Sequence, residues 1–175
     1  MAFKLHGSLN PHGGPVLYRG IIANAVTITE LDAVILDTDG FVALGTAGVA
    51  LLGHVIGLSD KNGVGLNTTG VAGAAMGSFA GTFLTADANE TTGGQVRAEV
   101  DISQLTLYSA TPDAALADTP GSDQAGVYFD LKNEYSIDET TVSDSAAQYH
   151  SWGVDPLTTT SVVVNIFESS VFNTA

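Results

Sequence analysis

The 175-residue sequence contains no cysteine. Disulfide bonds, thiolate zinc sites, iron–sulfur clusters and cysteine nucleophiles are therefore all excluded. Basic residues are also scarce, because five Lys and Arg stand against 19 Asp and Glu and give a formal net charge of −14. A strongly acidic surface repels phosphate backbones, so we do not expect nucleic acid as a partner.

The motifs of the common enzyme classes are missing as well. None of the lysines follows a glycine, as the lysine of a phosphate-binding P-loop does. The pair Gly63 and Gly65 lacks the third glycine of a dinucleotide-binding turn. The zinc motif His-Glu-x-x-His and the nucleophile turn Gly-x-Ser-x-Gly do not occur. We therefore predict a protein that is not an enzyme and that has no catalytic residues, no cofactor and no metal site.

One apolar stretch is nearly long enough to span a membrane. It is Phe41 to Leu58, with the sequence FVALGTAGVALLGHVIGL and no formal charge. Four glycines and His54 interrupt it, and aspartates rather than basic residues flank it. The N-terminus has no apolar region of the signal-peptide kind. We predict two short buried strands joined by a glycine turn, and no membrane contact.

The composition favours β structure. Glycine occurs 20 times and charged residues make up 14% of the chain, which suits a turn-rich β protein better than a helical bundle. Alternation is clearest over Gln95 to Ser103, where we expect the apolar residues to be buried and Arg97, Glu99 and Asp101 to face outward. The phase changes afterwards, which predicts a bulge near Gln104.

Other short apolar runs between turn residues predict further strands. They are Ala33–Leu36, Phe41–Leu44, Val49–Leu58, Val127–Leu131 and Ser161–Phe167. Residues Asn67 to Ala86 fit either an irregular loop with short strands or a glycine-rich helix, and we favour the loop. Residues Ser136 to Ser151 are polar and acidic. The prediction is a mostly β protein, a small β-barrel or β-sandwich formed by residues 21–175.

Residues 1–20 differ from this domain because they contain basic residues and no acid. Two prolines and the Gly13-Gly14 pair exclude a helix there. We predict an extended N-terminal arm that binds a partner, and a domain that folds without it. A flexible terminus and an arm packed on its own domain are the alternatives. The predicted partner-binding residues are Phe3, Lys4, Leu5, Leu9, Leu17, Tyr18 and Arg19.

Several polar and aromatic groups have a structural and a functional interpretation. His54 lies in an apolar stretch and is expected to be a hydrogen-bonded core or interface histidine. Asp37-Thr38-Asp39-Gly40 resembles half of a calcium loop, but a hairpin turn is the simpler interpretation. The pair Asp138 and Glu139 is expected to be part of a solvated acidic run.

The sequence also places three ring-bearing residues together. Tyr149 and Trp152 flank His150. Such a patch suits sugar binding, but we favour a plug of the protein core, because large aromatic side chains dominate core packing.

The order of elements between Ala23 and Leu66 resembles that of a known family. A first strand, a Leu-Asp segment, a strand that ends at Gly45 and the strand LLGHVIGL follow one another. The closing segment is YSIDETTVSDSAAQYHSWGVDPLTTTSVVVNIF. This pattern resembles the decoration, or cement, proteins of tailed bacteriophage capsids. The resemblance implies a small β protein, often with an N-terminal arm, that clamps neighbouring major capsid subunits from outside.

The expected function is therefore that of a structural virion protein on the capsid exterior, bound to the major capsid protein. A homotrimer is expected, because decorated shell positions often have local threefold symmetry and because Val49 to Leu58 is more apolar than one small body needs. The alternative is a glycan- or surface-binding virion module, such as a head fibre or an adhesin.

Overall fold

The computed structural model describes residues 3–9, 15–23, 26–60, 62–63, 65, 69–70, 79–80, 82–84, 96–116, 124–141, 147–158 and 160–167. The prediction of a mostly β protein is confirmed, since strands account for the regular structure of these ranges and no α-helix occurs in them. No helix within the same ranges is long and apolar enough to cross a membrane.

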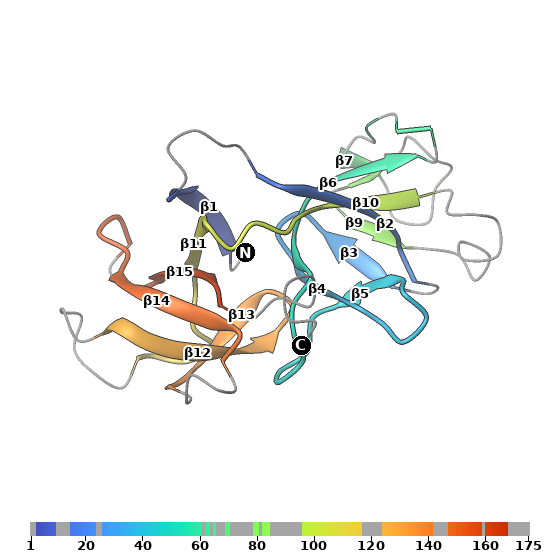
Figure 1. The fold of residues 1–175 in the computed structure, drawn as a ribbon. Helices are drawn as coiled ribbons and strands as arrows, with labels where there is room; N and C mark the ends of the chain where they lie inside the picture. The colour runs from blue at the N-terminus through green and yellow to red at the C-terminus, as the bar shows by residue number, and fades with distance from the viewer. Residues whose placement is uncertain are drawn as a thin grey trace.

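The larger sheet has six antiparallel strands (Figure 1). Their order is β1 (Phe3–Ser8), β11 (Thr106–Ala110), β15 (Val162–Ile166), β14 (Tyr149–Val154), β12 (Ala125–Asn133) and β13 (Ser136–Thr141). The N-terminal strand β1 is therefore an edge strand whose neighbour comes about a hundred residues later in the chain.

The second sheet has five strands. Their order is β2 (Leu17–Ile21), β10 (Val96–Asp101), β6 (Gly53–Asp60), β4 (Ala33–Leu36) and β5 (Val42–Leu44). Two further pairs are β3 (Thr27–Thr29) with β9 (Thr82–Leu84), and β7 (Thr69–Gly70) with β8 (Phe79–Ala80). Neither large sheet closes on itself among the described strands, so the architecture is consistent with a β-sandwich and is not a barrel.

Strand β10 follows the predicted alternation, with one exception. Val96, Val100 and Ile102 are buried as expected. Asp101 was expected to face outward, and this is wrong, because its carboxylate is buried. It accepts hydrogen bonds from the Tyr108 hydroxyl at 3.0 Å and from the Ser103 backbone N–H at 2.9 Å. These two donors offset the cost of removing the carboxylate from water.

The phase change after Ser103 has a different cause from the one predicted. The chain makes a turn at residues 103–106, closed by a 3.3 Å bond from the Thr106 N–H to the Ser103 carbonyl. The chain then continues as strand β11 in the six-stranded sheet (Figure 1). The predicted bulge near Gln104 is thus a crossover between sheets.

The N-terminal segment makes the same crossing. Strand β1 pairs with β11 in the six-stranded sheet, and β2 pairs with β10 in the five-stranded sheet. The two crossovers are joined by 2.8 Å backbone hydrogen bonds, from the Leu9 N–H to the Leu105 carbonyl and from the Ile102 N–H to the Val16 carbonyl. The described part of residues 1–20 is therefore packed on its own domain.

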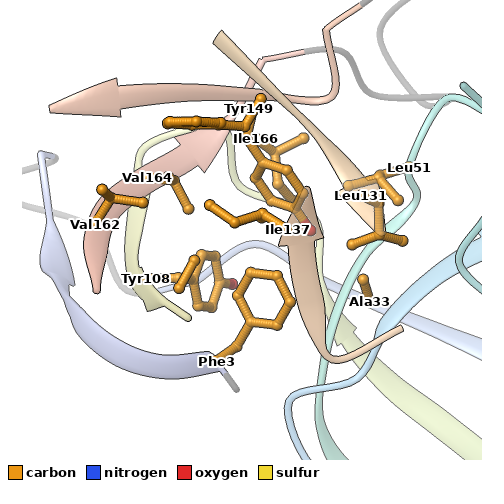
Figure 2. Close-up of a cluster of buried hydrophobic side chains, with 12 residues drawn as sticks. Phe3, Ala33, Leu51, Tyr108, Leu131, Ile137, Tyr149, Val162, Val164 and Ile166 are labelled. Atoms are coloured by element: carbon orange, nitrogen blue, oxygen red, sulfur yellow. The ribbon is translucent and has the colours of Figure 1, made fainter. Parts of the chain in front are cut away.

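One core cluster lies on the inner face of the six-stranded sheet. Figure 2 shows the rings of Phe3, Tyr108 and Tyr149 pointing into a common interior, with Leu131 and Leu51 on one side. Leu51 comes from the chain just before β6, so this cluster joins the two sheets. Burial of such side chains is the main favourable contribution to folding.

A second cluster belongs to the five-stranded sheet and the strand β3. It contains Ile22, Ile28, Val34, Val42, Leu52, Val55, Leu58 and apolar residues of β10. Leu51, Leu52, Val55 and Leu58 are thus buried within the chain itself. Apart from the exposed Val49, the large apolar residues of the stretch that suggested contacts between copies are buried or half-buried, and the stretch supplies no argument for a trimer.

The predicted turn at Asp37 is confirmed as a hairpin turn. Strands β4 and β5 pair on either side of it. The Asp37 carboxylate accepts backbone hydrogen bonds from Asp39 at 3.0 Å and from Phe41 at 2.8 Å, and Gly40 has a φ of 84°. The carboxylate caps the turn in the manner of an Asx turn.

Within Asn67–Ala86 the described residues are 69–70, 79–80 and 82–84, and they lie in short strands. The rest of that segment lies outside the described residues.

Candidate binding surfaces

The predicted arm residues fall into two groups. Phe3 is buried, with 1% of its surface exposed, and Tyr18 is half-buried against the second core cluster. The others are exposed, namely Lys4, Leu5, Leu9, Leu17 and Arg19. Phe3 is therefore a core residue of β1. The structure leaves the three leucines on the surface.

These leucines belong to a larger apolar surface, which we call the N-terminal surface. Its members are Leu5, Leu9, Val16, Leu17 and Leu105, all of them large exposed apolar side chains. Leu5 is 64% exposed, although it pairs in the β1–β11 ladder with Tyr108, whose side chain is buried in the core. The crossover hydrogen bonds place the backbone of Leu9 next to that of Leu105, and the backbone of Val16 next to that of Ile102. Sequence reasoning missed Leu105.

An apolar cavity opens beside this surface. Its volume is about 350 Å³, and it is lined by Leu5, Gly7, Ser8, Pro15, Glu30, Leu31, Ile56, Asp101 and Thr106. Leu31 is the described non-glycine residue with positive φ, at 69°. Its conformation belongs to a turn in which Asp32 accepts hydrogen bonds from the Thr29 N–H at 2.6 Å and the Thr29 hydroxyl at 2.9 Å. The residues that line the cavity come from strands of both large sheets, so the cavity lies between the two sheets.

The basic groups of this region face acids of the same chain. Arg19 forms a salt bridge with Glu99 at 2.5 Å across the β2–β10 pair. Burial raises the pKa of Asp155, but hydrogen bonds from the Ser109 hydroxyl and the Leu157 N–H, with smaller contributions from His6 and Lys4, lower it below its ordinary value overall. The positive charge of residues 1–20 therefore acts within the domain, and exposed pairs of this kind stabilise it little.

Trp152 is not a plug of the core. It lies on the outer face of β14 and is 50% exposed. Its ring contacts His150 edge-on, with centroids 5.4 Å apart, and His150 contacts Tyr128 at 5.2 Å. Tyr128 in turn contacts Phe167 at 4.9 Å. We call these four residues the aromatic face.

Tyr149, by contrast, points inward and meets His54. The fully buried imidazole lies 3.0 Å from the Leu31 carbonyl through Nδ1 and 3.0 Å from the Tyr149 hydroxyl through Nε2. Because a carbonyl can only accept, Nδ1 carries the hydrogen and Nε2 accepts from Tyr149. Burial lowers the pKa of His54 to about 4, against the raising effects of the Leu31 carbonyl and of Asp101. The prediction of a hydrogen-bonded core histidine is confirmed.

Asp138 and Glu139 lie next to Asp113, with oxygens of all three within 4.8 Å of one another. Lys132 reaches Asp113 and Asp138 at 3.3 Å each. The hydrogen bond with Asp113 is the largest of the effects that raise the pKa of Lys132. Asp113 and Asp138 thus pair with a lysine of their own chain.

Comparisons of this chain with protein-family models, with curated proteins and with solved structures find no match.

Proposed function

We propose that this chain is a structural virion protein that decorates the outside of a tailed-bacteriophage capsid and holds neighbouring major capsid subunits together. The resemblance in sequence pattern suggests this class of protein. The observation that carries the proposal is the N-terminal surface, where five aliphatic side chains are exposed and one of them, Leu5, lines an apolar cavity. Clustered exposed apolar groups of this kind mark protein contacts.

The strands beneath this surface favour a protein partner as well. Strand β1 begins the order of one sheet and β2 begins the order of the other. Edge strands present backbone groups to which a strand of another protein can add. A capsid subunit that docks here would therefore bury the leucine side chains and form backbone hydrogen bonds with an edge strand.

Binding at this surface requires little ordering of the protein. A free arm that becomes ordered on a capsid would lose about 1–2 kcal/mol of backbone entropy per residue. The described parts of residues 1–20 are already paired as β1 and β2. The leucines are therefore presented on a preorganised surface, and more of their burial energy appears as affinity.

The N-terminal surface is tested by replacing Leu5 and Leu17 together with serine. Contacts of this kind contribute about 1 kcal/mol or more each, so binding is expected to weaken about 10- to 100-fold. The measurement is occupancy on undecorated heads of the phage that encodes the chain, by co-sedimentation over a range of protein concentrations. Folding is checked by circular dichroism, because both side chains are exposed and their loss should leave the fold intact.

The matched control is Leu157→Ser. Leu157 is 84% exposed, lies in the β14–β15 connection and is not one of the five residues of the N-terminal surface. Its replacement is expected to leave occupancy unchanged. Equal occupancy of the double variant and the control would refute the docking surface, and no stoichiometric binding of the wild-type protein would refute the decoration function itself.

The homotrimer remains a prediction that rests on shell geometry alone. Decoration at a local threefold position suits a closed trimer. Light scattering of the free protein and subunit counting on decorated heads measure it directly.

A further inference from the structure

The backbone around Trp152 is shaped by two irregularities on neighbouring strands. The pairing of β14 with β15 shifts register between Ser151 and Gly153, and Gly153 has a φ of 117°. The pairing of β12 with β14 shifts between Ala125 and Tyr128, and Gly126 between them has a φ of 78°. Bulges of this kind redirect side chains and are frequent next to functional sites.

The Trp152 ring is held in place although half of it is exposed. Its indole N–H donates a hydrogen bond to the Asn165 side-chain oxygen at 2.7 Å. The Asn165 amide nitrogen donates in turn to the Gln104 carbonyl at 2.9 Å and the Ile166 carbonyl at 3.2 Å. Asn165 is thus a positioning residue that ties the ring to the sheet, so little side-chain entropy remains to be lost on binding.

The aromatic face extends this ring into a continuous row. Tyr128, His150 and Asn165 stand opposite one another on three adjacent strands. The edge-on contact of 89° between His150 and Trp152 fixes their relative orientation. With histidine neutral, none of these side chains carries a formal charge, although the chain as a whole has a net charge of −14.

We infer that the aromatic face is a binding site for an uncharged carbohydrate chain. Sugar rings combine apolar C–H faces with hydroxyl groups, and aromatic rings accompanied by a few polar groups match both. The half-buried phenol and imidazole of Tyr128 and His150 offer donors and acceptors next to the Trp152 ring. An anionic polysaccharide is disfavoured, because the acidic protein would repel it.

The two surfaces differ in the type of residue that forms them, and they therefore suit different partners. The N-terminal surface is formed by aliphatic residues on or next to the edge strands β1 and β2 and in the turn before β11, whereas the aromatic face consists of rings on or next to the inner strands β12, β14 and β15. They share no residue. Carbohydrate binding therefore goes beyond the proposed capsid contact, and either one can fail without the other.

The sequence supplies its own reporter, because Trp152 is the single tryptophan of the chain. Intrinsic fluorescence of the full-length protein is titrated with dextran, amylose, mannan and galactan, and with alginate as the anionic comparison. A neutral polysaccharide that binds should shift the Trp152 emission to shorter wavelength and protect it from acrylamide quenching. Alginate should do neither.

Variants are compared by their retardation in gels that contain the bound polysaccharide. Trp152→Ala is expected to weaken binding about tenfold or more. Tyr135→Ala is the matched control, since Tyr135 is also 50% exposed but lies in the β12–β13 turn. Asn165→Ala keeps the reporter and should increase the mobility of the ring, seen as lower fluorescence anisotropy, while weakening binding.

Three results would overturn the inference. The first is the absence of any emission change with all four neutral polysaccharides. The second is equal retardation of the Trp152 and Tyr135 variants. The third is an emission change with undecorated capsids and with no polysaccharide, which would assign the aromatic face to a protein partner.

Discussion

Replacing Phe3 by alanine is expected to lower the free energy of unfolding by about 3–5 kcal/mol. The ring is 1% exposed and lies 4.5 Å from the His54 ring and 5.6 Å from the Tyr149 ring, measured between centroids. Its removal leaves a cavity where the two sheets meet, in surroundings that collapse only partly. A loss of this size is a large share of the stability of a single domain.

Urea unfolding followed by far-ultraviolet circular dichroism measures this loss. Leu5→Ala is the matched control, because Leu5 lies on the same strand and is 64% exposed. Its cost in stability is expected to be below about 1 kcal/mol. If both variants unfold at the same urea concentration, β1 does not contribute Phe3 to the core.

Deletion of residues 1–20 is expected to be more damaging than either substitution. It removes Phe3 from one core cluster and the strand β2 from the edge of the other sheet. Strands β10 and β11 would each lose a neighbour and expose apolar surface. The sequence-based expectation that the remaining domain folds unaided is therefore replaced by the expectation of a strongly destabilised or unfolded chain.

The parts of the fold that could be predicted from the sequence are those with a local pattern of apolar, polar and turn residues. Strand β10 shows alternation over six residues, and β4 and β5 flank a turn that Asp37 and Gly40 define. Strand β1 has no such pattern, since only Phe3 is buried in it and its partner β11 lies far along the chain. Pairing at this distance is decided by packing of the whole domain, which a local pattern does not encode.

The position of Trp152 was predicted wrongly because β14 was not recognised as a strand. The segment that contains β14 begins in an acidic stretch and did not show as a strand. In a strand, successive side chains point to opposite faces, so Tyr149 and Trp152 at an odd separation face opposite ways. The structure accordingly has Tyr149 in the core and Trp152 on the surface. Asn165, which holds the ring, is too distant in sequence to have been linked to it.

Acidification is expected to protonate His54 and thereby to lower the free energy of unfolding. Its pKa is about 4 in the folded protein against an ordinary 6.5, so between these values the unfolded chain binds a proton that the folded chain does not. Stability from this group is therefore complete above pH 6.5 and falls as the pH drops to 4. At about 1.4 kcal/mol per pKa unit, the loss amounts to about 3 kcal/mol.

Asp32 acts in the opposite direction over nearly the same range. Burial raises its pKa to about 6, from an ordinary 3.8, against the two hydrogen bonds from Thr29. The folded chain therefore holds a proton between pH 3.8 and 6 that the unfolded chain has released, and stability falls as the pH rises through this window. The two groups offset each other, so these sites together should leave the wild-type protein with a shallow pH profile between 4 and 6.

Two neutral variants separate these contributions. His54→Gln retains a donor for the Leu31 carbonyl and an acceptor for the Tyr149 hydroxyl, and it does not titrate. It is expected to be less stable than wild type at pH 7, because ring contacts are lost, and to gain about 3 kcal/mol relative to wild type between pH 6.5 and 4. Asp32→Asn should behave in the opposite way and lose stability relative to wild type as the pH falls from 6. The measurement is urea unfolding at half-unit pH intervals. A constant difference in stability between His54→Gln and wild type across this range would mean that the imidazole is not held neutral by the fold.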